Sequence, residues 1–441
     1  MQTPHVAIVQ NQYPSSHRLH AISDTKLCFN DEVRVMQITD FLQKHLSPKA
    51  VILLAYESDM TAHFEAYLQQ IWPQGRILIV TEPFYREYAE RTLLPALNAS
   101  GFETEYCLCI QSTGTTYRAQ IDESLGDGAI DGIVGIAALG SATLFAAARE
   151  RACALNIACC ALLDQFCPRD AFAACDESGN KPCADALFFD LNAIQQKNRD
   201  LRDALLELEV GVYALKADMA AAQALGRRIQ DGVSDALNEA MPPRLPDLYH
   251  PTEDELAQLC EAYCWRAVAT RLLARHTSYQ TVLDYANASP EYPKFSAAAH
   301  AQLMVTIFEA ALELESLEIS PEDCANRQPP KEILQRTLQQ ILLEDNVKFE
   351  WLKRADENFE DRNALRHTIN ALVMNWDEFC AKLRPISDVL QAISAQNAAH
   401  PEDEIDSTLK TLWMHAARFA PKHTFLKLFN DMSIVEPALY I

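Results

Sequence analysis

Apolar positions follow two different patterns along the chain, and the change falls near residue 192. Before it, short apolar runs alternate with segments whose apolar residues have helical spacing. This alternation predicts a parallel sheet covered by helices. The expected strands are 5–10, 51–56, 77–80, 103–110, 132–136 and 158–163, and the expected helices are 33–45, 61–71, 84–99 and 116–125.

After residue 192 long helical patterns dominate, and no glycine follows Gly232. The expected helices are 201–225, 252–275, 296–317, 330–355, 364–395 and 406–419. The fold class predicted from both patterns is α/β, with a parallel-sheet domain of the dinucleotide-binding type over residues 1–193. An all-helical domain is expected over residues 194–441.

The composition and charge argue against several classes of function. The chain has 441 residues and a formal net charge of -23, which argues against nucleic-acid and anionic-membrane surfaces because both need clustered Lys and Arg. No apolar run reaches the roughly 18 residues of a membrane helix, and the N-terminus lacks the features of a signal peptide. A cytoplasmic location is therefore expected, with most of the thirteen cysteines reduced and buried as small apolar side chains.

The segment 130–191 is the most informative part of the chain. A strand-like run ends at the small-residue turn Ala-Ala-Leu-Gly-Ser, followed by an Ala-rich helix and a second apolar strand. In such a βαβ unit the turn is where a dinucleotide phosphate binds. In this turn only Gly140 and Ser141 are suited to form a phosphate-binding cradle, and Ser141 is equally suited to cap the helix.

Four segments carry a resemblance to a known superfamily. They are IDGIVGIAALGSATLFAAA, CPRDAFAACDESGNKPCADALFFDL, GVYALKADM and AAAHAQLMVTIFEAA. Together they are similar to the iron-containing alcohol dehydrogenases, glycerol dehydrogenase and dehydroquinate synthase, nearest to sn-glycerol-1-phosphate dehydrogenase. The C-terminal segment ARFAPKHTFLKLFNDMSIVE also resembles the end of glycerol-1-phosphate dehydrogenases.

The resemblance implies a specific chemistry. In that superfamily one carboxylate and two histidines hold a divalent metal such as zinc, iron or nickel, which polarises the substrate oxygen while NAD or NADP exchanges hydride. It implies that Gly140 and Ser141 contact the cofactor and that Asp170 lies near the substrate. The implied metal ligands are Glu207 or Glu209, His276 and His300.

Each of these residues also has a structural interpretation. The two glutamates would lie on a solvated helix face, and His300 would be a buried histidine with satisfied hydrogen bonds. His276 would cap a helix C-terminus. Asp170, beside Arg169, would form an ion pair or a turn.

The chain departs from the family pattern at positions that bind the cofactor and the metal in that family. Family glycines fall on Ala138 and Leu139, and the metal carboxylate falls on Leu208. Leu139 is expected to project where backbone amides would approach pyrophosphate. The family aspartate and lysine of the following helix fall on Leu144 and Ala147.

Two functions stay open from the sequence. The first is a divergent NAD(P)- and metal-dependent dehydrogenase that acts on a small alcohol or polyol phosphate between its domains. The alternative is a catalytically inactive descendant that acts as a binding or assembly protein. A lyase like dehydroquinate synthase would need the same metal and dinucleotide. The oligomeric state stays open, a homo-oligomer included.

Overall fold

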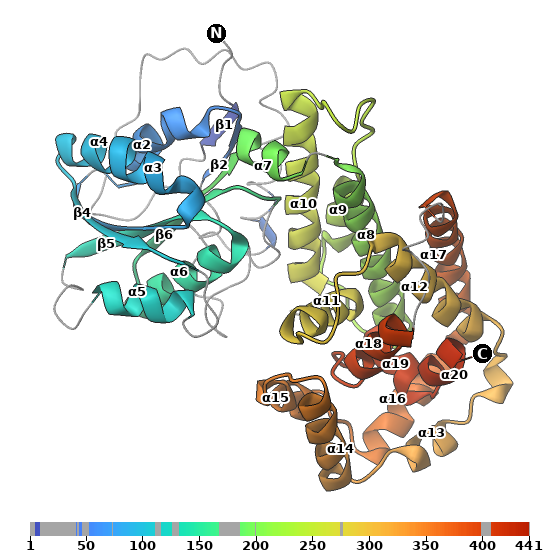
Figure 1. Ribbon diagram of the computed structural model, residues 1–441. Helices are drawn as coiled ribbons and strands as arrows, with labels where there is room; N and C mark the ends of the chain where they lie inside the picture. Colours follow the sequence, from blue (N-terminus) through green and yellow to red (C-terminus); the bar gives the residue numbers. More distant parts are fainter. Residues whose placement is uncertain are drawn as a thin grey trace. The chain divides into compact units, whose positions relative to one another are not determined.

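In the computed structural model the chain forms two compact units (Figure 1). Unit 1 comprises residues 1–201 and 243–271, and unit 2 comprises residues 202–242 and 272–441. The structure describes residues 5–8, 41, 44–45, 53–72, 74–110, 116–125, 132–166, 186–198, 200–273, 277–397 and 407–440.

Unit 1 is built on a seven-stranded sheet of order β1-β2-β7-β6-β5-β3-β4. Every neighbouring pair from β2 to β4 is parallel, which confirms the predicted fold class. The edge strand β1 is the exception, because it runs antiparallel to β2. The strands are β1 (His5–Ile8), β2 (Leu53–Glu57), β3 (Arg76–Thr81), β4 (Glu103–Leu108), β5 (Ile133–Gly140), β6 (Ala158–Leu163) and β7 (Ala186–Asp190).

The helices of unit 1 alternate with its parallel strands, except α10, which belongs to a later segment of the chain. The predicted helix 84–99 is divided into a 3-10 turn, a short α-turn, a π-turn and a final α-helix. The elements are α2 (Met60–Ile71), η1 (Pro83–Tyr85), α3 (Arg86–Tyr88), η2 (Ala89–Leu93), α4 (Leu94–Ala99), α5 (Tyr117–Leu125), α6 (Ala142–Leu155), α7 (Leu191–Lys197) and α10 (Glu253–Leu273).

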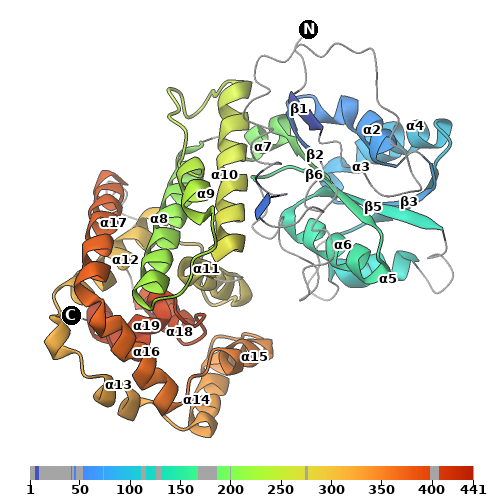
Figure 2. The same ribbon diagram turned by 180° about the vertical axis from the view of Figure 1, so that it is seen from behind.

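Unit 2 consists of helices only among its described residues (Figure 2). They are α8 (Arg202–Ala224), α9 (Val233–Glu239), α11 (Ser278–Ala288), α12 (Ala297–Leu312), α13 (Pro321–Arg327), α14 (Lys331–Glu344), α15 (Glu350–Glu357), α16 (Arg362–Met374), α17 (Trp376–Asn397), α18 (Ser407–Ala417), α19 (Phe425–Asp431) and α20 (Val435–Tyr440), with the 3-10 turn η4 (Ser316–Glu318).

Two predicted helices of unit 2 are broken. The pattern over 330–355 forms α14 and α15, because Asn346 adopts a left-handed conformation with φ of 52° between them. The pattern over 364–395 forms α16 and α17, separated at Asn375. The Asn375 side chain donates hydrogen bonds to the carbonyls of Ala224 and Ala371, at 2.8 and 3.1 Å.

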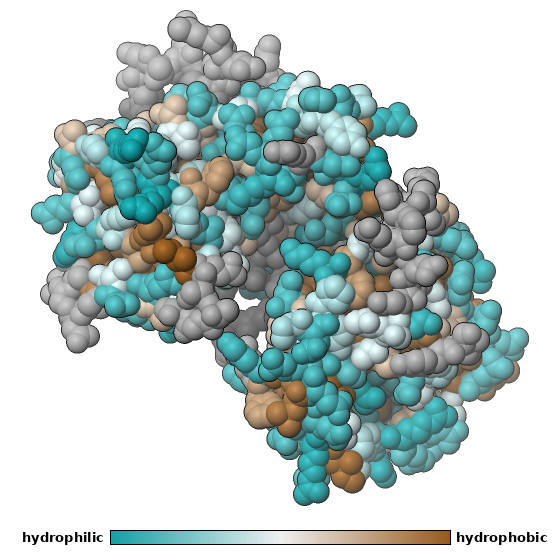
Figure 3. Space-filling model, viewed as in Figure 1, coloured by the Kyte–Doolittle hydropathy of each residue, from teal (hydrophilic) through white to brown (hydrophobic). Residues whose placement is uncertain are grey.

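The surface agrees with the acidic composition. Figure 3 shows hydrophilic side chains over most of the visible face, with small separate apolar patches. In the part of the chain that the structure describes, no helix combines the length and the hydrophobicity needed to cross a membrane.

Asp218 joins three helices of unit 2. This carboxylate on α8 is buried and accepts hydrogen bonds from the backbone N–H and hydroxyl of Ser278, at 2.8 and 2.6 Å. It also accepts one from the backbone N–H of Phe425, at 3.0 Å. Burial outweighs these bonds and raises the pKa of Asp218 to about 6.

This raised pKa predicts how stability depends on pH. Because the folded state favours the protonated carboxyl, the contribution of Asp218 is complete below pH ~4 and is lost as pH rises through about 6. The loss is about 3 kcal/mol. The non-titrating variant Asp218→Asn should lack this step, so the difference in unfolding free energy between the two proteins should narrow from pH 4 to pH 7. Urea titrations at both pH values would measure it, and a widening difference would show that the hydrogen bonds prevail.

Candidate functional site

The turn between β5 and α6 is at the position predicted for a phosphate cradle. The strand is longer than expected, because residues 137–140 pair with β3 and β6, and the turn is confined to Gly140 and Ser141. Gly140 has φ of 144°, and the Ser141 hydroxyl accepts a hydrogen bond from the backbone N–H of Leu144. Ser141 thus caps α6, one of the two roles predicted for it.

An internal carboxylate occupies this turn. One oxygen of Glu82, which follows β3, accepts a hydrogen bond from the backbone N–H of Ser141 at 3.1 Å. The other accepts from the Ser141 hydroxyl and from the Tyr117 hydroxyl, the latter at 2.7 Å. A Cβ at Gly140 would lie 2.7 Å from Glu82 Oε2. The carboxylate therefore fills the place that a phosphate would take at the N-terminus of α6.

Leu139 differs from its expected role. It was expected to project toward the phosphate, but it lies fully buried in the sheet core with Leu162 and Phe188. The reason is the strand geometry, because Leu139 pairs with Thr81 and Leu162 and its side chain enters the core. Glu82, and not Leu139, is the group that obstructs the cradle.

Other carboxylates follow the parallel strands at the same edge of the sheet. Glu57 ends β2, Asp164 follows β6 and Asp190 ends β7. Glu57 accepts a hydrogen bond from Tyr67 at 2.6 Å, and Asp190 accepts one from Tyr85 at 3.1 Å.

The Glu82 carboxylate opposes an anionic ligand at this turn, because it would repel a pyrophosphate. Asp164 pairs with Lys197 at 2.6 Å, and burial raises the pKa of both Asp164 and Asp190, which reduces their negative charge. The groups present at this edge do not fit NAD or NADP.

The candidate metal carboxylates lie on α8 of unit 2. Leu208, at the family position, is fully buried, while its neighbours Glu207 and Glu209 are half-buried. Burial raises the pKa of Glu209. In the ranges that the structure describes, no three His, Cys, Asp or Glu side chains lie close enough together to hold a metal ion. The predicted residues Asp170 and His276 lie outside those ranges.

His300 is buried on α12 and has a hydrogen-bond partner. Its Nδ1 accepts a hydrogen bond from the indole N–H of Trp413 at 3.0 Å, and the rings of Tyr279 and Phe295 lie near it. An indole N–H can only donate, so the proton of the neutral ring is on Nε2. Burial lowers the pKa of His300 to about 4. This ring has no free lone pair for a metal and does not fit the ligand role.

The geometry of His300 predicts that it does not retain metal. His300→Gln keeps an acceptor for the Trp413 indole but removes the imidazole, so metal content should be unchanged by the substitution. After incubation with Zn²⁺ and gel filtration, elemental analysis should give the same low value for both proteins. Retention of about one equivalent by the wild type and its loss in the variant would contradict this interpretation.

Sequence reasoning missed Glu82 and Trp413. Glu82 follows an expected strand, and a carboxylate at a strand end is a signal of function in parallel sheets, but its partner Ser141 is 59 positions away. Trp413 is 113 positions from His300. No local pattern links such residues.

Comparisons with known proteins give weak similarities. No family model and no curated protein matches the chain. Among solved structures, maleylacetate reductase from Rhizobium sp. strain MTP-10005 is 10% identical, covering 86% of this chain and 98% of its own, with a TM-score of 0.41. Glycerol dehydrogenase from Schizosaccharomyces pombe is 9% identical, covering 85% and 95%, with a TM-score of 0.40.

An archaeal halo-thermophilic alcohol dehydrogenase from a Red Sea brine pool is 11% identical, covering 89% of this chain and 98% of its own, with a TM-score of 0.45. These three proteins are a maleylacetate reductase, a glycerol dehydrogenase and an alcohol dehydrogenase. Similarity of this degree assigns no function by itself.

Proposed function

We propose that this chain is a divergent descendant of the dehydrogenase superfamily that does not use NAD(P) and acts as a binding or assembly protein. The observation that carries the proposal is the Glu82 carboxylate in the turn at Gly140 and Ser141. A dinucleotide would have to displace this carboxylate and leave it without its three donors. The phosphates of the dinucleotide would also be repelled by the displaced carboxylate, which has the same sign of charge.

The helical unit supports the same proposal from different residues. Leu208 takes the place of the metal carboxylate, and His300 is held by Trp413. The changes at the cofactor position and at the metal position concern separate residues in separate units. Because dehydrogenation of this type needs both groups, the two changes together support the proposal.

A second candidate is the divergent NAD(P)- and metal-dependent dehydrogenase acting on an alcohol or polyol phosphate, of the glycerol-1-phosphate type. The favouring observation is that the cradle backbone is retained, since Gly140 keeps a φ of 144° and Ser141 starts a helix of 14 residues. Under this proposal the Glu82 side chain moves aside when the dinucleotide binds.

Dinucleotide binding separates the two candidates. We expect NADH and NADPH at millimolar concentration to leave the melting temperature of the wild type unchanged. In Glu82→Ala, the freed donors of Ser141 and Tyr117 should allow the nucleotide to stabilise the fold, by about 2.7 kcal/mol at 100 times its dissociation constant.

The matched control is Glu87→Ala, which removes an exposed carboxylate of the same unit paired only with Arg91 on the surface. It should behave as the wild type does. A rise in the wild-type melting temperature with either dinucleotide would contradict the inactive assignment and favour the dehydrogenase.

A further inference from the structure

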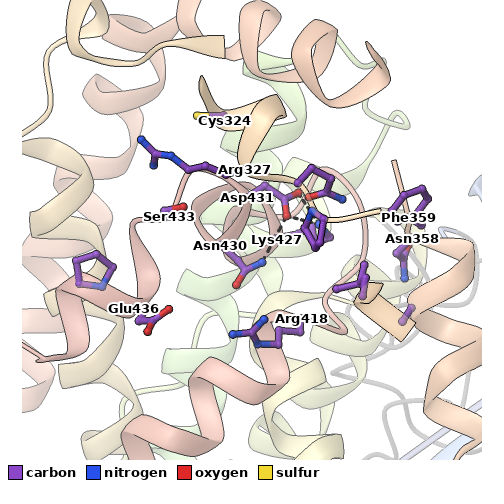
Figure 4. A pocket seen from close by; sticks show the side chains of 15 residues that line it. Cys324, Arg327, Asn358, Phe359, Arg418, Lys427, Asn430, Asp431, Ser433 and Glu436 are labelled. Atoms are coloured by element: carbon purple, nitrogen blue, oxygen red, sulfur yellow. Dashed lines mark hydrogen bonds and ion pairs between the residues drawn. The ribbon is translucent and has the colours of Figure 1, made fainter. Parts of the chain in front are cut away.

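Unit 2 contains a pocket of about 530 Å³ that the proposed function does not use. It lies among the end of α13, the end of α15, and helices α19 and α20 (Figure 4). Its volume is in the range of small-molecule sites, roughly 300 to 1,000 Å³. Six of its lining residues belong to the C-terminal segment that resembles the end of glycerol-1-phosphate dehydrogenases, namely Arg418, Lys427, Asn430, Asp431, Ser433 and Glu436.

The charged side chains of the pocket differ in whether they have a partner within the protein. Lys427 and Asp431 form a buried ion pair, visible in Figure 4, and neutralise each other. Arg418 is different, because its Nε is buried and has no hydrogen-bond partner among the residues that the structure describes. Arg327 lines the same pocket and is exposed, and Glu436 is the other acidic residue of the lining.

The guanidinium group of Arg418 is the feature that points to a ligand. Among the described residues no carboxylate forms an ion pair with it, so an anion in the pocket would supply that partner. Guanidinium can donate two parallel hydrogen bonds to two oxygens of a carboxylate or phosphate group. In a chain of net charge -23, a pocket lined by two arginines, Arg327 and Arg418, that form no ion pair with the described residues is a local exception.

The other residues that line the pocket indicate which chemical groups the rest of the ligand should have. The side chains of Asn430 and Ser433 add hydrogen-bonding groups to the lining, while Leu334, Ala355 and Phe359 add apolar surface. Figure 4 shows Phe359 beside Asn358, whose carboxamide oxygen accepts a hydrogen bond from the backbone N–H of Lys422 at 3.2 Å. A compact anionic group attached to an apolar body would match both parts.

We propose that this pocket binds a small organic anion, a carboxylate or phosphate monoester with an apolar body, through the guanidinium of Arg418. Arg327 contributes positive charge at the rim, and the Lys427–Asp431 pair holds the floor in place. The site belongs to unit 2 alone and is independent of whether the turn at Ser141 binds a nucleotide.

Calorimetric titration of the full chain with phenyl phosphate and with benzoate tests the proposal, with phenol as the neutral probe. At least one of the two anions should bind with one-to-one stoichiometry, and phenol should not. Which anion binds more tightly distinguishes phosphate from carboxylate. Arg418→Gln should weaken binding at least about tenfold, because a charge-assisted hydrogen bond is lost.

Two further variants keep the test informative if Arg418→Gln does not fold. Glu436→Gln removes a negative charge from the lining and should tighten binding. Arg366→Gln removes an arginine of the same unit that pairs with Glu322 outside the lining, and should leave affinity unchanged. Absence of binding by both anions, equal binding of phenol, or unchanged affinity in a folded Arg418→Gln would overturn the proposal. Unchanged binding in Glu82→Ala would show that the outcome is separate from the cofactor question.

Discussion

The hydrogen bonds between the Glu82 carboxylate and the turn at Ser141 are the interaction on which this account depends. A helix N-terminus after a parallel strand attracts one negative group, and here the chain supplies that group itself. The Tyr117 hydroxyl adds a third donor, and the glycine at 140 leaves the space that the carboxylate needs. The fold therefore keeps the geometry of an anion site while using it for an internal contact.

In the helical unit, too, positions expected to bind a metal instead make contacts within the protein core. His300 has the sequence position of a metal ligand, but its ring is buried among aromatic side chains and accepts the Trp413 indole proton. Burial keeps it neutral, and Leu208 beside the two glutamates is part of the core. The His300 imidazole, which could bind a metal in an open site, is instead engaged in a hydrogen bond and in aromatic contacts. At the pocket around Arg418, a buried guanidinium nitrogen has no hydrogen-bond partner among the described residues.

Much of the fold could be predicted from the sequence, because strand and helix periods are local properties. Five of the six parallel strands were predicted, but β7 was not among the expected strands, and β5 extends to Gly140 instead of ending near residue 136. Breaks within long helical patterns were not predicted, since a single left-handed residue such as Asn346 leaves the apolar spacing intact. The site was less predictable for the same reason. The roles of Glu82 and Trp413 depend on partners distant in sequence, and the outward role expected of Leu139 was wrong because strand pairing turns it into the core.

The most direct test of the account is a crystal structure of the protein soaked with NAD⁺ at a concentration far above physiological levels. The account predicts density for the Glu82 carboxylate against the Ser141 backbone N–H and hydroxyl, with no dinucleotide density at the turn. A pyrophosphate bound at Ser141, with the Glu82 side chain displaced, would contradict it.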